Sequence, residues 1–93
     1  MNPIDLKQKD KQYIANTYGR FDLCIEKGAN ATCKDYQDKF YIDFTSGIGV
    51  NSLGFSNQKW YTAVAKQAEN LNHVSNLYYS EPCITLAEKL INR

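Results

Sequence analysis

Glycine is frequent in residues 43–54, which read DFTSGIGVNSLG and contain Gly47, Gly49 and Gly54. Glycine-rich loops can hold phosphate groups, because backbone N–H groups approach a ligand where no Cβ intervenes. The spacing here does not match the G-x-G-x-x-G fingerprint of dinucleotide sites, and no Gly-Lys-Ser/Thr follows. The middle of the stretch is apolar, so we expect it to pack near a pocket or an interface rather than to form a phosphate cradle by itself.

Histidine and cysteine can bind metals or act in catalysis, and in this chain they are scattered along the sequence. Cys24, Cys33 and Cys83 form no C-x-x-C pair, and His73 is the one histidine. A structural zinc site takes four such ligands, commonly in close pairs, so we predict no metal site. His73 with Ser75 lacks both a nucleophile elbow and a placed acid, which disfavours triad chemistry. Free thiols of a reducing compartment explain the cysteines better.

Length and net charge limit the classes of protein to which this chain can belong. A chain of 93 residues forms at most one small domain, and its net charge of +1 argues against nucleic acid as the main partner. The sequence has no long apolar run and no signal-peptide core at its amino terminus, so neither a membrane span nor export is expected. We therefore expect a cytoplasmic protein.

The elements that position the glycine-rich stretch begin with an arm, residues 1–17. Its charges are many, and Leu6, Tyr13 and Ile14 form only a weak helical stripe. The arm has little nearby to fold against, so we expect any partner that orders it to lie elsewhere.

Three short strands are expected next. Apolar and polar residues alternate over 21–26, a turn is expected at 28–30, and a shorter strand covers 31–34. A second turn at 35–38 leads to a third strand at 39–43. Because loops this short allow only antiparallel pairing, the sequence predicts a three-stranded meander with flanking helices, an α+β unit.

Two helices follow the glycines. Ser56 or Asn57 can cap the first, which is expected to end near Asn72, and Ser80 with Pro82 marks the start of the second. Both helices carry an apolar stripe at helical spacing. The stripes comprise Trp60, Ala63, Val64, Ala68 and Leu71, then Cys83, Leu86, Ala87 and Leu90.

Three stretches together carry a resemblance to a known family. They are YGRF at 18–21, FYIDFTSGIGVNSLG at 40–54 and LNHVSNLYYSEPCITLAEKL at 71–90. In this order they resemble the amino-terminal portion of class-III pyridoxal-phosphate aminotransferases, which have the fold-type-I architecture. SNLYY followed by a helix is most similar to the acetylornithine branch. The resemblance covers about residues 13–90, so the chain looks like a fragment of such an enzyme.

Two positions depart from the family pattern. Asp38 stands where a glycine is common in the second hairpin turn, and Phe55 stands where a histidine commonly follows Gly54. A proline that is common soon afterwards is also missing. Since Asp adopts left-handed conformations at modest cost, we expect the turn at Asp38 to be kept.

The resemblance implies an activity for the full-length parent. Acetylornithine aminotransferases transfer an amino group from N-acetylornithine to 2-oxoglutarate with pyridoxal 5'-phosphate, in arginine biosynthesis. In the family, the Schiff-base lysine and the cofactor-binding residues come after the segment that matches this chain. None of the 11 Lys and Arg residues falls in a matching Schiff-base motif. We expect no catalytic residue in the chain, no cofactor bound to it, and no activity from it alone.

Residues 18–93 would then be the amino-terminal part of the small domain and the start of the link to the large cofactor-binding domain. By resemblance, Tyr18, Ser46, Gly47 and Ile48 line the substrate site. The alternative is that Tyr18 plugs a hinge and Ile48 packs in a core.

The family also forms homodimers, which gives the tyrosines a role. The segment Asn76, Leu77, Tyr78 and Tyr79 is expected to lie against the large domain or the partner subunit, since tyrosine is frequent at interfaces.

Three other interpretations stay open at the level of sequence. One is a stand-alone interaction module that has lost its chemistry, and another is a small phosphate- or nucleotide-binding domain using Gly47 and Gly49. The third keeps the family and changes the amino donor to ornithine or γ-aminobutyrate.

Overall fold

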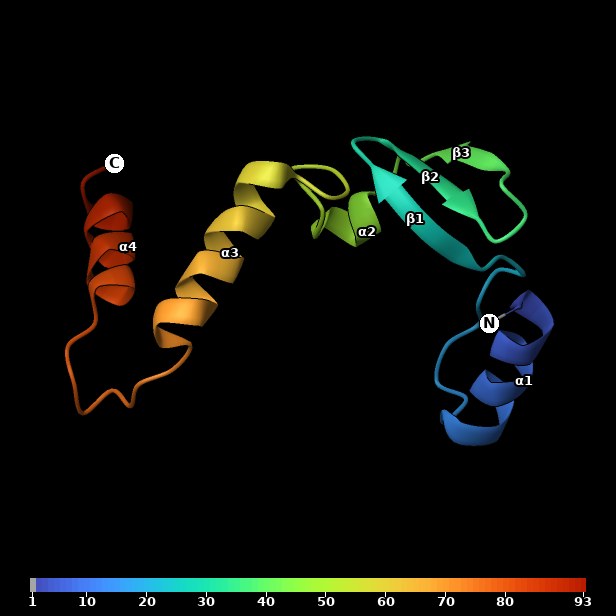
Figure 1. Cartoon of the computed structure of the whole chain (residues 1–93), viewed down its shortest axis with the longest axis horizontal. Helices are drawn as coiled ribbons and strands as arrows, with labels where there is room; N and C mark the ends of the chain where they lie inside the picture. The colour runs from blue at the N-terminus through green and yellow to red at the C-terminus, as the bar shows by residue number, and fades with distance from the viewer. Residues whose placement is uncertain (1) are drawn as a thin grey trace. The chain divides into compact units, whose positions relative to one another are not determined.

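The computed structural model describes residues 2–93, which form two compact units, one ending at Gln58 and one comprising Lys59–Arg93. The elements of the first unit are α1 (Pro3–Tyr13), β1 (Ile25–Ala29), β2 (Thr32–Asp35), β3 (Phe40–Ile42) and the short α2 (Ser46–Gly49). They are followed by α3 (Gln58–Leu71) and α4 (Glu81–Ile91) (Figure 1). The strands pair antiparallel in the order β1-β2-β3, so the predicted α+β meander with flanking helices is confirmed.

The first turn of the meander lies later than predicted. Gly28 and Ala29 belong to β1, where they pair with Cys33 and Thr32, and the chain reverses after Asn30. Asn30 has a φ of +54°, which asparagine tolerates better than most residues. The expected turn at 28–30 is therefore right for Asn30 and wrong for Gly28 and Ala29. A Cβ on Gly28 would lie 2.5 Å from Cγ of Phe55, so this glycine is used for close packing and not for reversal.

The predicted first strand, at 21–26, is also only partly right, because β1 begins at Ile25. The preceding residues face α1 instead of a neighbouring strand. Lys7 pairs with Asp22, and Nη1 of Arg20 lies 3.4 Å from Oδ2 of Asp10. The arm thus has a partner close by in sequence, and the expectation that it has little nearby to fold against is wrong.

The second hairpin is organised by the carboxylate of Asp35, which is only 6% exposed. Its Oδ1 accepts hydrogen bonds from the N–H groups of Gln37 (2.8 Å) and Lys39 (3.0 Å), and its Oδ2 accepts one from the Tyr41 hydroxyl (3.1 Å). Asp38 completes the turn at a φ of +62°, so the expectation that Asp keeps this turn is confirmed. Burial raises the pKa of Asp35, but its three donors outweigh that effect and hold the pKa below the usual 3.8.

A separate bridge ties the end of the glycine-rich stretch to the sheet. Asn30 N–H donates to the carbonyl of Phe55 (3.0 Å), and Phe55 N–H donates to the carbonyl of Asn30 (2.8 Å). The Ser56 hydroxyl adds a hydrogen bond to the carbonyl of Gly28 (2.8 Å). Gly54 makes this approach possible, because its φ is +81° and a Cβ would lie 2.9 Å from the Asn30 carbonyl oxygen.

The helices of the second unit match the sequence pattern closely. α3 ends at Leu71, next to the predicted end at Asn72. α4 begins after Ser80, which is its N-cap residue as predicted, with Pro82 in the first turn; the Ser80 side chain makes no capping hydrogen bond. The Ser80 carbonyl accepts from Ile84 N–H at 3.3 Å. No helix within residues 2–93 is long and apolar enough to cross a membrane.

The interior is small. Among the described residues, Cys33 is the one buried hydrophobic side chain and Asp35 the one buried charged side chain. Many large apolar side chains of the sheet and of α3 and α4 are more than half exposed, including Phe40, Ile42, Trp60, Leu86 and Leu90. The faces that the hydrophobic pattern assigned to a core are therefore open in this chain.

We expect Asp35→Asn to reduce stability in a pH-dependent way. Because folding lowers the pKa of Asp35, its charge contributes stability that is present above about pH 4 and is lost as the pH falls through the lowered pKa. Denaturant midpoints measured between pH 2 and 7 should show wild type above the variant at neutral pH and the two converging in acid. Glu69→Gln on α3 is the control and should track wild type throughout.

We expect Gly54→Ala to destabilise the protein by about 1–3 kcal/mol, because the new Cβ meets the Asn30 carbonyl at a left-handed φ. Gly19→Ala is the matched control, since a Cβ there meets nothing within 4 Å. Urea denaturation should leave Gly19→Ala near wild type. Equal midpoints for the two variants would contradict the role given to Gly54.

Candidate functional site

The predicted glycine-rich loop contains a left-handed turn. Four consecutive residues of α2 have positive φ: Ser46 (+52°), Gly47 (+59°), Ile48 (+62°) and Gly49 (+80°). A left-handed conformation is ordinary for glycine and unfavourable for other residues. The three glycines singled out in the sequence, Gly47, Gly49 and Gly54, all have positive φ, as their residue type predicts.

Hydrogen bonds within the loop hold this turn. Oδ1 of Asp43 accepts from both the N–H and the hydroxyl of Thr45, each at 2.8 Å. The Thr45 carbonyl in turn accepts from Ile48 N–H (2.9 Å) and Gly49 N–H (3.2 Å). The hydrogen bonds from Thr45 hold the pKa of Asp43 below its usual value, so the carboxylate form is favoured. Sequence reasoning missed this role, although D-x-T is a typical Asx-turn signal.

Ile48 is the most unusual residue of the turn. A β-branched side chain at positive φ is a genuine outlier, and a left-handed residue costs about 1–2 kcal/mol. The side chain is 95% exposed, so packing within residues 2–93 does not offset that cost. Strained residues of this kind cluster at functional sites. The turn therefore presents an apolar side chain outward at a defined position, and the expectation that the loop is packed over is not met within the described chain.

The predicted substrate-lining residues are only partly brought together. Ser46, Gly47 and Ile48 are neighbours on the left-handed turn. Tyr18 lies in the irregular segment between α1 and β1 and is 74% exposed. Within residues 2–93 no hydrogen bond links Tyr18 to the turn. Its assignment to the substrate site, like that of the turn, stays a prediction.

The predicted interface segment forms a turn between α3 and α4. Leu77 N–H donates to the Ser75 hydroxyl (3.2 Å), and Tyr78 N–H donates to the Ser75 carbonyl (3.0 Å). Leu77, Tyr78 and Tyr79 are all strongly exposed, Tyr79 to 97%. Asn76 lies at the start of the turn. The segment presents large side chains to its surroundings, and what contacts them stays a prediction.

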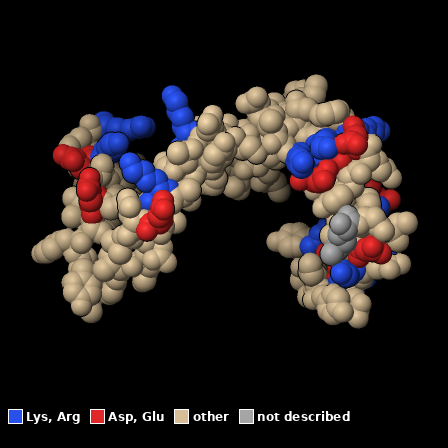
Figure 2. All heavy atoms as spheres, in the orientation of Figure 1, with Lys and Arg blue, Asp and Glu red and all other residues tan. Residues whose placement is uncertain are grey.

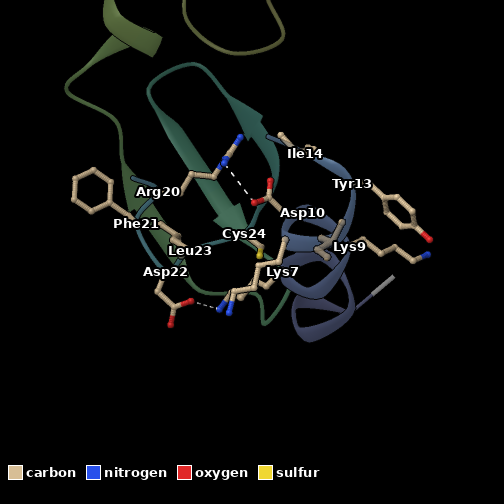
Figure 3. Close-up of a pocket in the computed structure, with 12 residues that line it drawn as sticks. Lys7, Lys9, Asp10, Tyr13, Ile14, Arg20, Phe21, Asp22, Leu23 and Cys24 are labelled. Carbon is tan, nitrogen blue, oxygen red and sulfur yellow. Dashed lines mark hydrogen bonds and ion pairs between the residues drawn. The ribbon is translucent and has the colours of Figure 1, made fainter. Parts of the chain in front are cut away.

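A groove of about 560 Å³ runs between α1 and the segment that leads to β1 (Figure 3). The Lys7–Asp22 and Asp10–Arg20 pairs connect its two walls. The hydrogen bond with Asp22 raises the pKa of Lys7, and the bond from Lys7 lowers the pKa of Asp22. The apolar part of the lining comprises Leu6, Tyr13, Ile14, Phe21, Leu23 and Cys24. Opposite charges on the arm and just before β1 were the sequence signal for this contact.

Charge is mixed over the surface. Figure 2 shows acidic side chains close to basic ones on the visible face, with no large area of a single sign. Within residues 2–93 no group of three or more His, Cys, Asp or Glu side chains is placed to hold a metal ion. The site features of the chain are thus the left-handed turn, the exposed tyrosine segment and the groove.

Several solved aminotransferase structures share this architecture. The acetylornithine aminotransferase from Elizabethkingia anophelis matches with a TM-score of 0.93 over 99% of this chain and 24% of that chain, at 22% identity. The ornithine aminotransferase from Toxoplasma gondii matches with a TM-score of 0.84 over 96% of this chain and 22% of that chain, at 27% identity. The fold is therefore that of the pyridoxal-phosphate aminotransferases.

Sequence comparison places the chain more narrowly. Residues 13–93 match the family model described as Aminotransferase class-III. The acetylornithine aminotransferase of Haemophilus ducreyi is 46% identical over 91 residues, which cover 98% of this chain and 23% of that protein. The chain belongs to the class-III aminotransferase family, and it spans roughly a quarter of the length of these relatives.

Two lysines of the chain, Lys7 and Lys34, have surroundings that do not suit a Schiff-base lysine. A Schiff-base lysine must reach its neutral form, which burial or a neighbouring cation favours. Lys7 and Lys34 instead pair with carboxylates, and their partners, Asp22 and Asp38, raise their pKa values. The surroundings of both lysines therefore favour the charged form.

We expect Ile48→Gly to stabilise the protein by about 1 kcal/mol, because glycine adopts the left-handed turn without strain and the lost side chain is exposed. Val50→Gly is the matched control: Val50 is also exposed but has a right-handed φ of −81°, so glycine there should destabilise. Urea midpoints that move in the same direction for both variants would contradict a strained turn at Ile48.

Proposed function

We propose that this chain is part of an acetylornithine aminotransferase, which transfers an amino group from N-acetylornithine to 2-oxoglutarate in arginine biosynthesis. The observation that carries the proposal is the identity shared with the Haemophilus ducreyi enzyme along nearly the whole chain. The family match supports the reaction class.

Pyridoxal 5'-phosphate would serve the full-length enzyme as the electron sink for transamination. In our proposal the Schiff-base lysine lies outside this chain, since none of the 11 Lys and Arg residues falls in a matching Schiff-base motif. The 93 residues would neither bind the cofactor tightly nor transaminate alone. Their contribution would be to shape the approach of the substrate.

The left-handed turn would supply that contribution. Ser46, Gly47 and Ile48 would line the mouth of the substrate site together with Tyr18. Ile48 supports this role because its side chain is exposed and its backbone is strained, and strained residues cluster at functional sites. An apolar group at the mouth would exclude water and select for the chain length and polarity of the amino donor.

The second unit would supply contact surface. Asn76, Leu77, Tyr78 and Tyr79 would lie against the large domain or the partner subunit of a homodimer, which their exposure supports. We also propose a cytoplasmic location, because scattered unpaired cysteines are typical of a reducing compartment.

A second candidate is an ornithine-type aminotransferase. The similarity to the Toxoplasma gondii ornithine enzyme favours it, since that match covers almost as much of the chain. The two candidates share the cofactor and differ in the amino donor, so substrate competition separates them.

Assays of the full-length protein test the proposal directly. With 2-oxoglutarate as acceptor, kcat/KM should be highest for N-acetylornithine among N-acetylornithine, ornithine and γ-aminobutyrate. The isolated 93-residue chain should show no turnover and no tight binding of pyridoxal phosphate, other phosphates or nucleotides. Preference for ornithine would favour the second candidate. A natural reading frame that ends at Arg93 would favour an interaction module, and tight nucleotide binding would favour a phosphate-binding domain.

We expect Ile48→Ala in the full-length protein to change the ratio of kcat/KM for N-acetylornithine to that for ornithine by about tenfold, the effect of a few methylene groups in an apolar site. Ile4→Ala, a substitution of the same kind on exposed α1, should leave the ratio unchanged. An unchanged ratio for Ile48→Ala would remove Ile48 from the substrate site.

A further inference from the structure

A continuous series of hydrogen bonds runs from the sheet to Ile48. Asp43 N–H donates to the Ala31 carbonyl (2.8 Å), which fixes the backbone of Asp43 to the first turn of the meander. Its Oδ1 accepts from Thr45 N–H and from the Thr45 hydroxyl (both 2.8 Å), and the Thr45 carbonyl accepts from Ile48 N–H (2.9 Å). The sheet thus fixes Asp43, Asp43 fixes Thr45, and Thr45 fixes Ile48.

The remaining backbone hydrogen bonds of the turn connect it to its C-terminal side, where Phe55 pairs with Asn30 of the sheet. Ser46 accepts from Asn51 N–H (2.8 Å) through its carbonyl, and Gly54 N–H donates to the Asn51 carbonyl (2.9 Å). These bonds close the turn on itself and on its own C-terminal side. Asp43 directly follows β3, and its side chain accepts the two hydrogen bonds from Thr45 at the start of the turn.

Ser46 and Ile48 have a right-handed alternative, as all non-glycine residues do. In that alternative the Cα–Cβ bond of Ile48 would point in another direction, because the side-chain direction follows from φ and ψ. The exposed Ile48 side chain has no packing within residues 2–93 to prevent this change. Some other feature must therefore select the left-handed turn.

We propose that Asp43 is a positioning residue for substrate selection: its carboxylate fixes Thr45, and through Thr45 the left-handed turn that directs Ile48. The inference rests on the proposed function for the contact between Ile48 and the amino donor. Asp43 acts through the turn and makes no contact with the substrate.

Kinetics of the full-length enzyme test the role of the carboxylate. Asp43→Ala should raise KM for the amino donor about tenfold and change kcat less than about twofold, the pattern of lost substrate binding. Asp43→Asn keeps an Oδ1 acceptor for Thr45 and should restore KM to near wild type. Thr45→Val keeps the N–H and loses the hydroxyl, so it should have a smaller effect in the same direction. Asp22→Ala removes a carboxylate from the same unit and should leave KM unchanged.

A double-mutant cycle tests whether Asp43 acts through Ile48. In an Ile48→Gly background, Asp43→Ala should have no further effect on KM, since the side chain that it directs is gone. A tenfold effect of Asp43→Ala in both backgrounds would overturn the proposal, because Asp43 would then act on the substrate directly.

Crystal structures of the variants separate this inference from the proposed function. In Asp43→Ala the φ of Ser46 and Ile48 should leave the left-handed region, and in Asp43→Asn they should stay there. Unchanged φ values in Asp43→Ala overturn the positioning role whatever the kinetics show. A second outcome is that the turn changes in Asp43→Ala while KM stays at the wild-type value in both Asp43→Ala and Ile48→Gly. That outcome overturns the substrate-lining role of Ile48, and with it the predicted effect of Asp43 on KM.

Discussion

Both ends of the glycine-rich loop are fixed at one place, the turn between β1 and β2. Asp43 enters the loop bonded to the carbonyl of Ala31, and Phe55 leaves it bonded in both directions to Asn30. Because neighbouring residues of the turn hold the two ends, the loop between them has little freedom to move relative to the sheet. Its backbone must return within a short distance, and the positive φ values of the glycines make that return possible. Within the closed loop the Asp43 carboxylate bonds Thr45, whose carbonyl accepts from Ile48 N–H.

The same first unit keeps very little hydrophobic core. Its buried residues are Cys33 and Asp35, and three hydrogen bonds satisfy the Asp35 carboxylate. The apolar side chains of the sheet and the long helices are largely exposed. This surface fits the proposed place of the chain in a larger protein, where other segments of a class-III aminotransferase would cover it.

The departures from the family pattern have a structural reading. Phe55 packs its ring against Gly28, so the position where a histidine is common carries an apolar contact with β1 in this chain. Asp38 occupies a left-handed turn and pairs with Lys34 at 2.5 Å. Phe55 therefore contacts β1, and Asp38 belongs to the turn between β2 and β3.

The sequence by itself determined the meander, the two long helices and the family. Alternation, turn residues and helical stripes are local signals, and a family resemblance needs only the order of residues. Only the tertiary structure decided where β1 begins, why Gly28 is a glycine, what α1 contacts and how Asp35 and Asp43 are used. Each of these depends on residues that are distant in sequence or on hydrogen bonds whose geometry appears once the chain has folded. The alternation of residues 21–24 predicted part of a strand, but Phe21 is 94% exposed and these residues lie beside α1 instead of a neighbouring strand.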